Sequence, residues 1–185
     1  MKKPILLAFF AAFLASSSSA SGELVPPKLR LDDGARPLRY SVDLTILPEK
    51  QTFEGKIDIE VEFARSQTLF WLHANELTIH KAHLEIEGKD LQVEVLPTEE
   101  NFIAIRWKQP FGPGVGKLHL EYTGLISSTD YTGVFKQKDG AEWYVYSHFE
   151  ATEARRAFPC FDEPHFKVPW QLSLHVKEEG TLGCF

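Results

Sequence analysis

Apolar and polar residues alternate along most of this chain with a period of two. The alternation first appears over residues 38–46 and is clearest over residues 57–63, where Ile, Ile, Val and Phe alternate with acidic residues. Successive side chains of a strand point to opposite faces, so this period indicates strands with one buried face. Further short strands are predicted at 67–72, 77–86, 117–122 and 169–176.

Breaks in the alternation predict how these strands are joined. The apolar positions before residue 80 and after residue 81 lie in opposite phase, which predicts a β-bulge near His80 or Lys81. Turn residues predict a turn at 88–90 and two hairpins, one of 91–95 with 101–107 around Pro97 and one of 131–135 with 143–146 across 138–140.

No segment keeps a helical period of 3.6 residues for more than about ten residues, so we expect no long helix. The one helical candidate is a short turn over residues 152–157, with Thr152 as its N-cap. Many short strands separated by turns predict an all-β domain, an antiparallel β-sandwich.

The first twenty residues resemble a secretory signal peptide. Lys2 and Lys3 precede an apolar stretch at 5–14 that is too short to span a bilayer, and Ser18 and Ala20 provide small residues for cleavage. We therefore expect residues 1–20 to be removed, residues 21–35 to form an extended leader and residues 36–185 to form the domain. An exported protein, periplasmic or extracellular, follows from this interpretation, and an uncleaved membrane anchor is the alternative.

Charge and cysteine content narrow the possible partners. The formal net charge of −6 becomes −8 when Lys2 and Lys3 are removed with the signal peptide. An acidic domain is a poor ligand for nucleic acid, whose phosphates require Lys and Arg, and nothing after the signal predicts membrane binding. A disulfide between Cys160 and Cys184 is possible in an oxidising compartment, but two unpaired thiols are the favoured interpretation, since Cys184 is the penultimate residue.

Residues 150–167, EATEARRAFPCFDEPHFK, combine three Phe, two Pro, one Cys and many charges. Such a composition is typical of an irregular, tightly folded segment, and segments of that kind often carry functional sites. The four Trp residues are assigned to the core and to strand faces, because no pair of them is spaced as a sugar-binding platform.

Within this segment, ARRAFPCFDEP at 154–164 resembles the signature of the aminopeptidase N family, the zinc-dependent gluzincin aminopeptidases that include leukotriene A hydrolases. Residues 36–63, with the phrase TFEG, and residues 73–84, HANELTIHKAHL, resemble the opening strands of the same family. The resemblance implies a saddle-shaped N-terminal β-domain that packs on a thermolysin-like catalytic domain. That domain would follow later in the protein, so we expect this chain to be truncated at its C-terminal end.

The resemblance also implies that the parent enzyme uses zinc, whereas the zinc motif His-Glu-x-x-His is absent from these 185 residues. His80 and His83 are spaced by three without a Glu, and a strand would point their rings to opposite faces. We therefore expect them to be ordinary strand histidines, with no metal bound and no catalytic residue in this chain.

By resemblance, Glu150 is the residue that binds the α-ammonium group of a peptide substrate. His148 stands where many family members have a Gln that lines the pocket for the first side chain of the substrate. An imidazole there could change substrate preference and add pH sensitivity near neutrality. On spacing alone the favoured interpretation of Glu150 is a Glu stabilised at the start of a short helix, and the resemblance reverses this order. For His148, a surface histidine is an equal alternative.

The rest of the motif is expected to be structural. Charged side chains can satisfy buried backbone groups, Pro fixes the backbone angle φ, and Phe packs beneath the turn. The residues assigned this role are Arg155, Pro159, Cys160, Phe161, Asp162, Glu163 and Pro164.

Two hypotheses about function follow. The first is the N-terminal domain of an exported zinc aminopeptidase, which recognises peptide N-termini and docks on a catalytic domain. The second is a free-standing secreted β-sandwich that binds peptides or proteins without catalysis, because composition and strand pattern fit it equally well.

Overall fold

A computed structural model describes residues 24–98 and 101–176 of the chain. The expected signal peptide, its cleavage after Ala20 and the C-terminal Cys184 lie outside these ranges. Within them, no helix has the length and apolar character needed to cross a bilayer.

The alternating segments form a six-stranded sheet with the strand order β11-β1-β2-β8-β4-β5. This sheet has five pairs of neighbouring strands. The pair of β1 with β11 is parallel, and the other four pairs are antiparallel. Its strands are β1 (Ala35–Thr45), β2 (Thr52–Phe63), β4 (Leu77–Ile86), β5 (Lys89–Gln92), β8 (Gly114–Leu125) and β11 (Trp170–His175).

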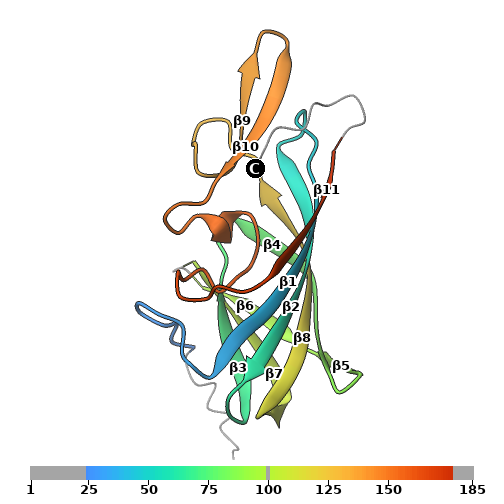
Figure 1. Ribbon diagram of the computed structural model, residues 1–185, viewed down its shortest axis with the longest axis vertical. Helices are drawn as coiled ribbons and strands as arrows, with labels where there is room; N and C mark the ends of the chain where they lie inside the picture. Colours follow the sequence, from blue (N-terminus) through green and yellow to red (C-terminus); the bar gives the residue numbers. More distant parts are fainter. Residues whose placement is uncertain (1–23, 99–100, 177–185) are drawn as a thin grey trace, which may run out of the picture.

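A three-stranded sheet, β3-β7-β6, packs against this large sheet (Figure 1). Its strands are β3 (Gln67–His73), β6 (Glu94–Pro97) and β7 (Phe102–Phe111). Phe63 of β2 contacts the rings of Phe70 on β3 and Trp107 on β7, with ring centroids 5.6 Å apart in both pairs. The two apolar faces therefore bury one common core, as in a β-sandwich.

The hairpin of β9 (Gly133–Asp139) and β10 (Glu142–His148) stands apart from both sheets at the upper end of the molecule (Figure 1). Lys136 of β9 is almost fully buried and donates hydrogen bonds to the backbone oxygens of Pro48 and Lys50 in the β1–β2 turn. This buried ammonium group ties the hairpin to the large sheet.

The all-β fold class, the second hairpin and the bulge are confirmed. The register of β4 against β8 shifts between Ile79 and Lys81, as the change of phase predicts. The last strand is also confirmed, but it pairs in parallel with β1 and so departs from a purely antiparallel sandwich.

Two local predictions are wrong. Residues 91–95 do not form one strand of a hairpin, because Leu91 belongs to β5 and pairs with β4, whereas Val95 belongs to β6 and pairs with β7. The predicted turn at 88–90 is displaced to Glu87–Gly88, since Lys89 and Asp90 already pair with β4. Local turn chemistry alone does not show which sheet receives a short strand.

The predicted helical turn is also shorter than expected. Only a 3-10 turn, η1 (Ala154–Arg156), forms within residues 152–157. Its N-cap is Glu153 instead of Thr152, and no side chain caps it. The backbone N–H of Glu153 instead bonds to the oxygen of Phe149 at 3.0 Å, so the chain is already turning when it reaches this position.

Candidate functional site

The 150–167 segment connects β10 to β11 and folds over the end of β3. His73 at that end exchanges two backbone hydrogen bonds with Cys160, at 2.8 and 3.0 Å. The N–H of Asn75 bonds to the oxygen of Arg155 at 2.9 Å. The irregular segment therefore satisfies its backbone groups on the body of the domain and takes a fixed position.

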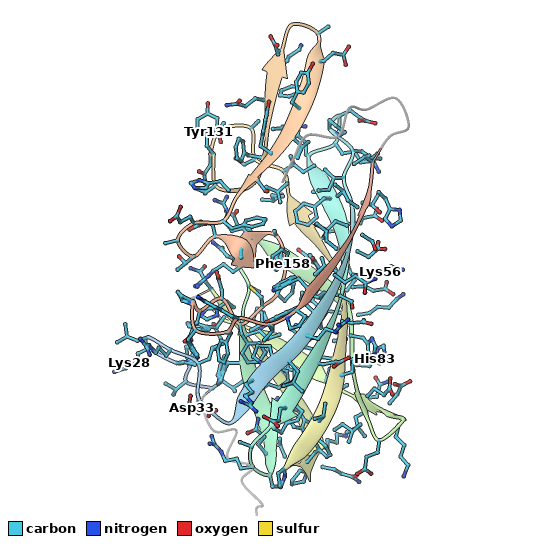
Figure 2. The ribbon with its side chains drawn as sticks, viewed as in Figure 1. Lys28, Asp33, Lys56, His83, Tyr131 and Phe158 are labelled. Atoms are coloured by element: carbon cyan, nitrogen blue, oxygen red, sulfur yellow. The ribbon has the colours of Figure 1, made fainter. Side chains whose placement is uncertain are left out.

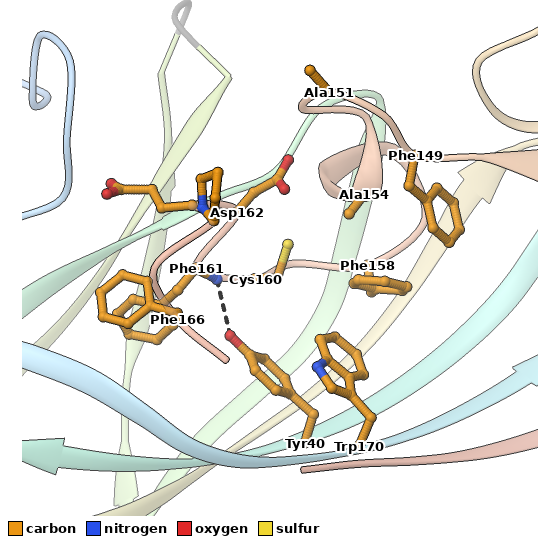
Figure 3. A pocket seen from close by; sticks show the side chains of 12 residues that line it. Tyr40, Phe149, Ala151, Ala154, Phe158, Cys160, Phe161, Asp162, Phe166 and Trp170 are labelled. Atoms are coloured by element: carbon orange, nitrogen blue, oxygen red, sulfur yellow. Dashed lines mark hydrogen bonds between the residues drawn. The ribbon is translucent and has the colours of Figure 1, made fainter. Parts of the chain in front are cut away.

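Two buried tyrosines hold the segment from below. The Tyr40 hydroxyl accepts a hydrogen bond from the Phe161 N–H at 3.0 Å (Figure 3). The Tyr122 hydroxyl donates one to the Ala157 oxygen at 2.9 Å. Burial raises the pKa of both phenols above the ordinary tyrosine value, so both remain neutral. The alternation over residues 38–46 and 117–122 places both rings on the buried face of a strand, and the hydroxyl group of a tyrosine at such a position signals a required partner.

Charged side chains complete the support. Arg155 Nε lies 2.8 Å from Asp162 Oδ2, and both side chains are nearly buried, with 14% and 13% exposed. The Glu163 carboxylate accepts a hydrogen bond from the Leu31 N–H at 2.6 Å and so attaches the leader to the segment. Arg156 donates to Glu76 and Asp130, which lie in two separate loops.

His73 is a buried part of this site that the sequence did not reveal. Its Nδ1 accepts a hydrogen bond from the Asp162 N–H at 3.1 Å, so the ring carries its hydrogen on Nε2. Burial, together with the neighbouring Arg155 guanidinium, lowers the pKa of His73 from 6.5 to about 4. The one available signal was a polar residue directly after the apolar run of β3.

Cys160 is a free thiol, buried in the described structure. Burial raises its pKa well above the usual value, and the nearby Asp162 carboxylate acts in the same direction. A buried neutral thiol is a poor nucleophile, so Cys160 acts as a packing residue.

Two cavities flank the segment. The first, about 420 Å³ in volume, is lined mainly by aromatic rings, with Tyr40 and Trp170 stacked at 4.0 Å on one side and Phe149 and Phe158 on another (Figure 3). The second, about 550 Å³, is more polar and lies between Lys28–Arg30 of the leader, His73 and Arg155.

His148 and Glu150 lie on the surface, where β10 ends and the 150–167 segment begins. His148 is the last residue of β10, opposite Gly133, and Glu150 follows in the turn. Both residues are exposed, and neither lines a cavity, although Phe149 and Ala151 line the first cavity and Thr152 lines the second. Within the described residues the Glu150 carboxylate has no side-chain partner, so it is available to an external cation.

No group of three or more His, Cys, Asp or Glu side chains in residues 24–98 and 101–176 is arranged to hold a metal ion. The site therefore consists of a rigid segment, two cavities and a free carboxylate. These features can bind and orient a ligand.

Comparison with known proteins identifies the family of this chain. The family model described as the Peptidase M1 N-terminal domain matches residues 36–182. This chain belongs to that family. The match begins at the first residue of the predicted domain and includes the whole 150–167 segment.

Curated relatives agree with this assignment. Glutamyl aminopeptidase of Bos taurus is 27% identical over 166 residues, covering 83% of this chain and 17% of the relative. Aminopeptidase M1-A of Oryza sativa subsp. japonica is 26% identical over 175 residues, covering 89% and 20%. Probable M1 family aminopeptidase 1 of Encephalitozoon cuniculi is 32% identical over 158 residues, covering 83% and 18%. The chain spans about a fifth of the length of these relatives.

Proposed function

We propose that this chain is the N-terminal part of an exported zinc aminopeptidase, which removes N-terminal residues from peptides. The observation that carries the proposal is the family match over residues 36–182, together with the names of the much longer relatives. The catalytic zinc would be held by a thermolysin-like domain outside this sequence. The residues present do not fit that zinc, because the chain lacks His-Glu-x-x-His and its described part holds no metal-ready cluster.

In this proposal Glu150 binds the α-ammonium group of the substrate. An aminopeptidase must measure the distance from that ammonium to the first peptide bond, and a carboxylate on a rigid support does so through short, directional, charge-assisted hydrogen bonds. The exposed carboxylate without a side-chain partner supports this role, as does the firm attachment of the adjoining segment to β3 and to Tyr40.

His148 contributes to the pocket for the first side chain of the substrate. It lies two residues before Glu150 and is exposed. A change of the imidazole to an amide, His148→Gln, is expected to alter the order of preference among N-terminal residues without abolishing activity.

The role of Glu150 is tested in the parent enzyme, with the catalytic part joined to this chain. Glu150→Ala removes a charge-assisted hydrogen bond of about 1.5–3 kcal/mol, so kcat/KM for aminoacyl nitroanilides should fall about 10- to 100-fold. Glu142→Ala is the matched control, because Glu142 is an exposed Glu at the start of β10, the strand that precedes Glu150. Equal kcat/KM for Glu150→Ala and the control would show that Glu150 does not bind substrate.

The isolated chain provides a second test. Alone it should hydrolyse no aminoacyl nitroanilide, with or without added zinc, and zinc-dependent turnover would contradict the proposal. The alternative, a free-standing binding module, is distinguished by reading the gene beyond codon 185. A reading frame that encodes Gly-x-Met-Glu-Asn and His-Glu-x-x-His supports the enzyme, and its absence supports the module.

A further inference from the structure

The outer face of the six-stranded sheet carries a cluster of two histidines and three carboxylates. His119 on β8 lies directly opposite Asp58 on β2 and His83 on β4, so three adjacent strands contribute to one row. Glu85, two residues after His83, and its partner Asp90 on β5 form the next row on the same face. We name these five residues the histidine–carboxylate cluster. His83 projects to the side of the sheet away from the 150–167 segment (Figure 2).

The two imidazole rings stack with their centroids 4.4 Å apart and their planes 14° apart. His119 Nδ1 lies 2.7 Å from Asp58 Oδ1. A carboxylate can only accept, so Nδ1 must carry a hydrogen, which leaves a lone pair on Nε2 when the ring is neutral. A carboxylate bonded to the far nitrogen of a histidine is the arrangement that orients metal-binding histidines.

The opposite nitrogens of both rings face carboxylates. His119 Nε2 lies 3.7 Å from Glu85 Oε2, and His83 Nε2 lies 3.8 Å from Asp90 Oδ1. Because the neutral His119 ring carries a lone pair on Nε2, its contact with Glu85 brings two acceptors face to face, and these repel unless a cation lies between them. A proton or a metal ion would satisfy both.

Among the described residues, no Lys or Arg side chain forms an ion pair with a carboxylate of the cluster. The ion pairs formed by Asp58, Glu85 and Asp90 there are with imidazoles alone. The neighbouring row differs, because Lys81 pairs with Glu121 at 3.0 Å. Lys117 lies opposite Glu85 in the register of β4 and β8, but the described residues show no ion pair between Lys117 and a carboxylate of the cluster.

We propose that the histidine–carboxylate cluster binds a divalent transition metal such as Zn²⁺. The ligands are Nε2 of His83, Nε2 of His119 and the carboxylate of Glu85 or Asp90, with water in the remaining position. Two imidazoles and one carboxylate form a ligand set that zinc accepts in proteins. Asp58 is a positioning residue that holds the His119 ring.

Binding requires the side chains to move, since three donors do not yet converge on one point among the described residues. The exposed side-chain fractions, 22% for His119, 41% for His83 and 44% for Glu85, leave room for these rotations. The expectation that His83 is an ordinary strand histidine considered it only with His80. The tertiary structure supplies His119 as its partner instead.

The site is separate from the 150–167 segment, and the proposal does not depend on the proposed aminopeptidase function. A bound ion would join β4 and β8, and Asp58 on β2 would hold the His119 ring in place. Because it binds the folded chain, it would raise thermal stability by mass action.

The test is a Zn²⁺ titration of the full chain, purified without an affinity tag and stripped with a chelator, by calorimetry at pH 7.5. We expect one ion per chain and a melting temperature that rises with Zn²⁺ concentration. His83→Asn and His119→Asn should each lower the affinity at least tenfold, and Asp58→Asn should lower it about 10- to 100-fold. His80→Asn is the matched control, because His80 lies on the same strand and bonds to Thr123 outside the cluster.

Several results would overturn the proposal. They are no saturable binding below about 1 mM, unchanged affinity in His119→Asn, or an equal loss in His80→Asn. Far-UV circular dichroism and the metal-free melting temperature establish that each variant is folded. NMR of the His119 ring separates the remaining case, because a doubly protonated ring that Zn²⁺ leaves unchanged would show that a proton alone occupies the cluster.

Discussion

Burial decides the chemistry of individual polar residues around the 150–167 segment. His73 is kept neutral by burial and by Arg155, whereas Glu150 lies at the surface with no side-chain partner among the described residues. Both are polar residues at the end of a strand or hairpin in the sequence. Their different roles come from the depth at which the fold places them.

The lowered pKa of His73 predicts a loss of stability in mild acid. Above pH 6.5 the ring is neutral in both the folded and the unfolded chain and has no effect. Between pH 6.5 and about 4 the unfolded chain binds a proton that the folded chain excludes, so the free energy of unfolding falls. The loss should approach about 3 kcal/mol near pH 4.

Urea denaturation at pH 7.5, 6, 5 and 4.5 measures this effect, with His73→Asn for comparison. The Asn oxygen can accept the Asp162 N–H but does not titrate, and all carboxylates remain common to both proteins. The variant should lose less stability than the wild type over this range. Identical pH dependence in the two proteins would refute the role of His73.

At the scale of elements, the 150–167 segment is ordered without regular structure beyond one short 3-10 turn. Its position depends on the backbone exchange between His73 and Cys160, on two tyrosine hydroxyls and on the Arg155–Asp162 pair. The backbone exchange and both tyrosine hydroxyls join the segment to residues of β1, β3 and β8 that are distant in sequence. We therefore expect the segment to take this position only when the sheets have formed.

Breaking the Arg155–Asp162 pair should be costly. Asp162→Ala leaves a nearly buried guanidinium group without its partner, which typically lowers the free energy of unfolding by about 3–5 kcal/mol. The double variant Arg155→Ala/Asp162→Ala should lose less than the sum of the single variants. Chemical denaturation of all four proteins completes this double-mutant cycle.

Glu94→Ala is the matched control, because Glu94 pairs with Arg106 at 2.6 Å while both side chains are about half exposed, at 57% and 43%. An exposed pair of this kind contributes about 0–1 kcal/mol. A loss in Asp162→Ala as small as that in Glu94→Ala would mean that the buried pair does not hold the segment.

At the scale of the whole molecule, two exposed apolar surfaces stand out. Trp143, Tyr144 and Tyr146 lie on β10, and Trp170 and Leu172 lie on β11, all between 38% and 51% exposed. On its outer side β11 has no neighbouring strand among the described residues, and it carries no Lys, Arg, Asp or Glu. The opposite edge, β5, is short and charged, which protects an edge strand.

These surfaces predict that the isolated chain self-associates reversibly. Large apolar patches and unprotected sheet edges favour association when the parts that would cover them are missing. Light scattering across a concentration series should show a mass that rises above the monomer. Leu172→Lys on the edge strand should shift the chain toward monomer.

Val115→Lys is the control for this substitution, because Val115 is equally exposed, at 51%, but lies at the start of β8 between β2 and β4. A wild-type chain that remains monomeric at every concentration would count against the proposed docking of this chain on a catalytic domain. Equal effects of the two substitutions would show that the β11 edge is not the contact.

The sequence by itself determined most of the strands and the place where β4 is bulged, because alternation records which side chains of a strand avoid water. The resemblance over residues 36–63 and 154–164 also assigned the family, and it selected Glu150 and His148 as candidates. Neither periodicity nor motif showed that Leu91 belongs to a different sheet from Val95.

Only the tertiary structure decided which distant residues meet. It laid β11 parallel to β1, set His73 beneath Asp162 and brought His119 against His83. Pairing between strands depends on how all the apolar faces are buried and all the strand edges are hydrogen-bonded in the whole domain. The sequence of a single segment does not contain this information. The same packing buries His73 and Cys160, and this burial lowers the pKa of His73 and raises that of Cys160.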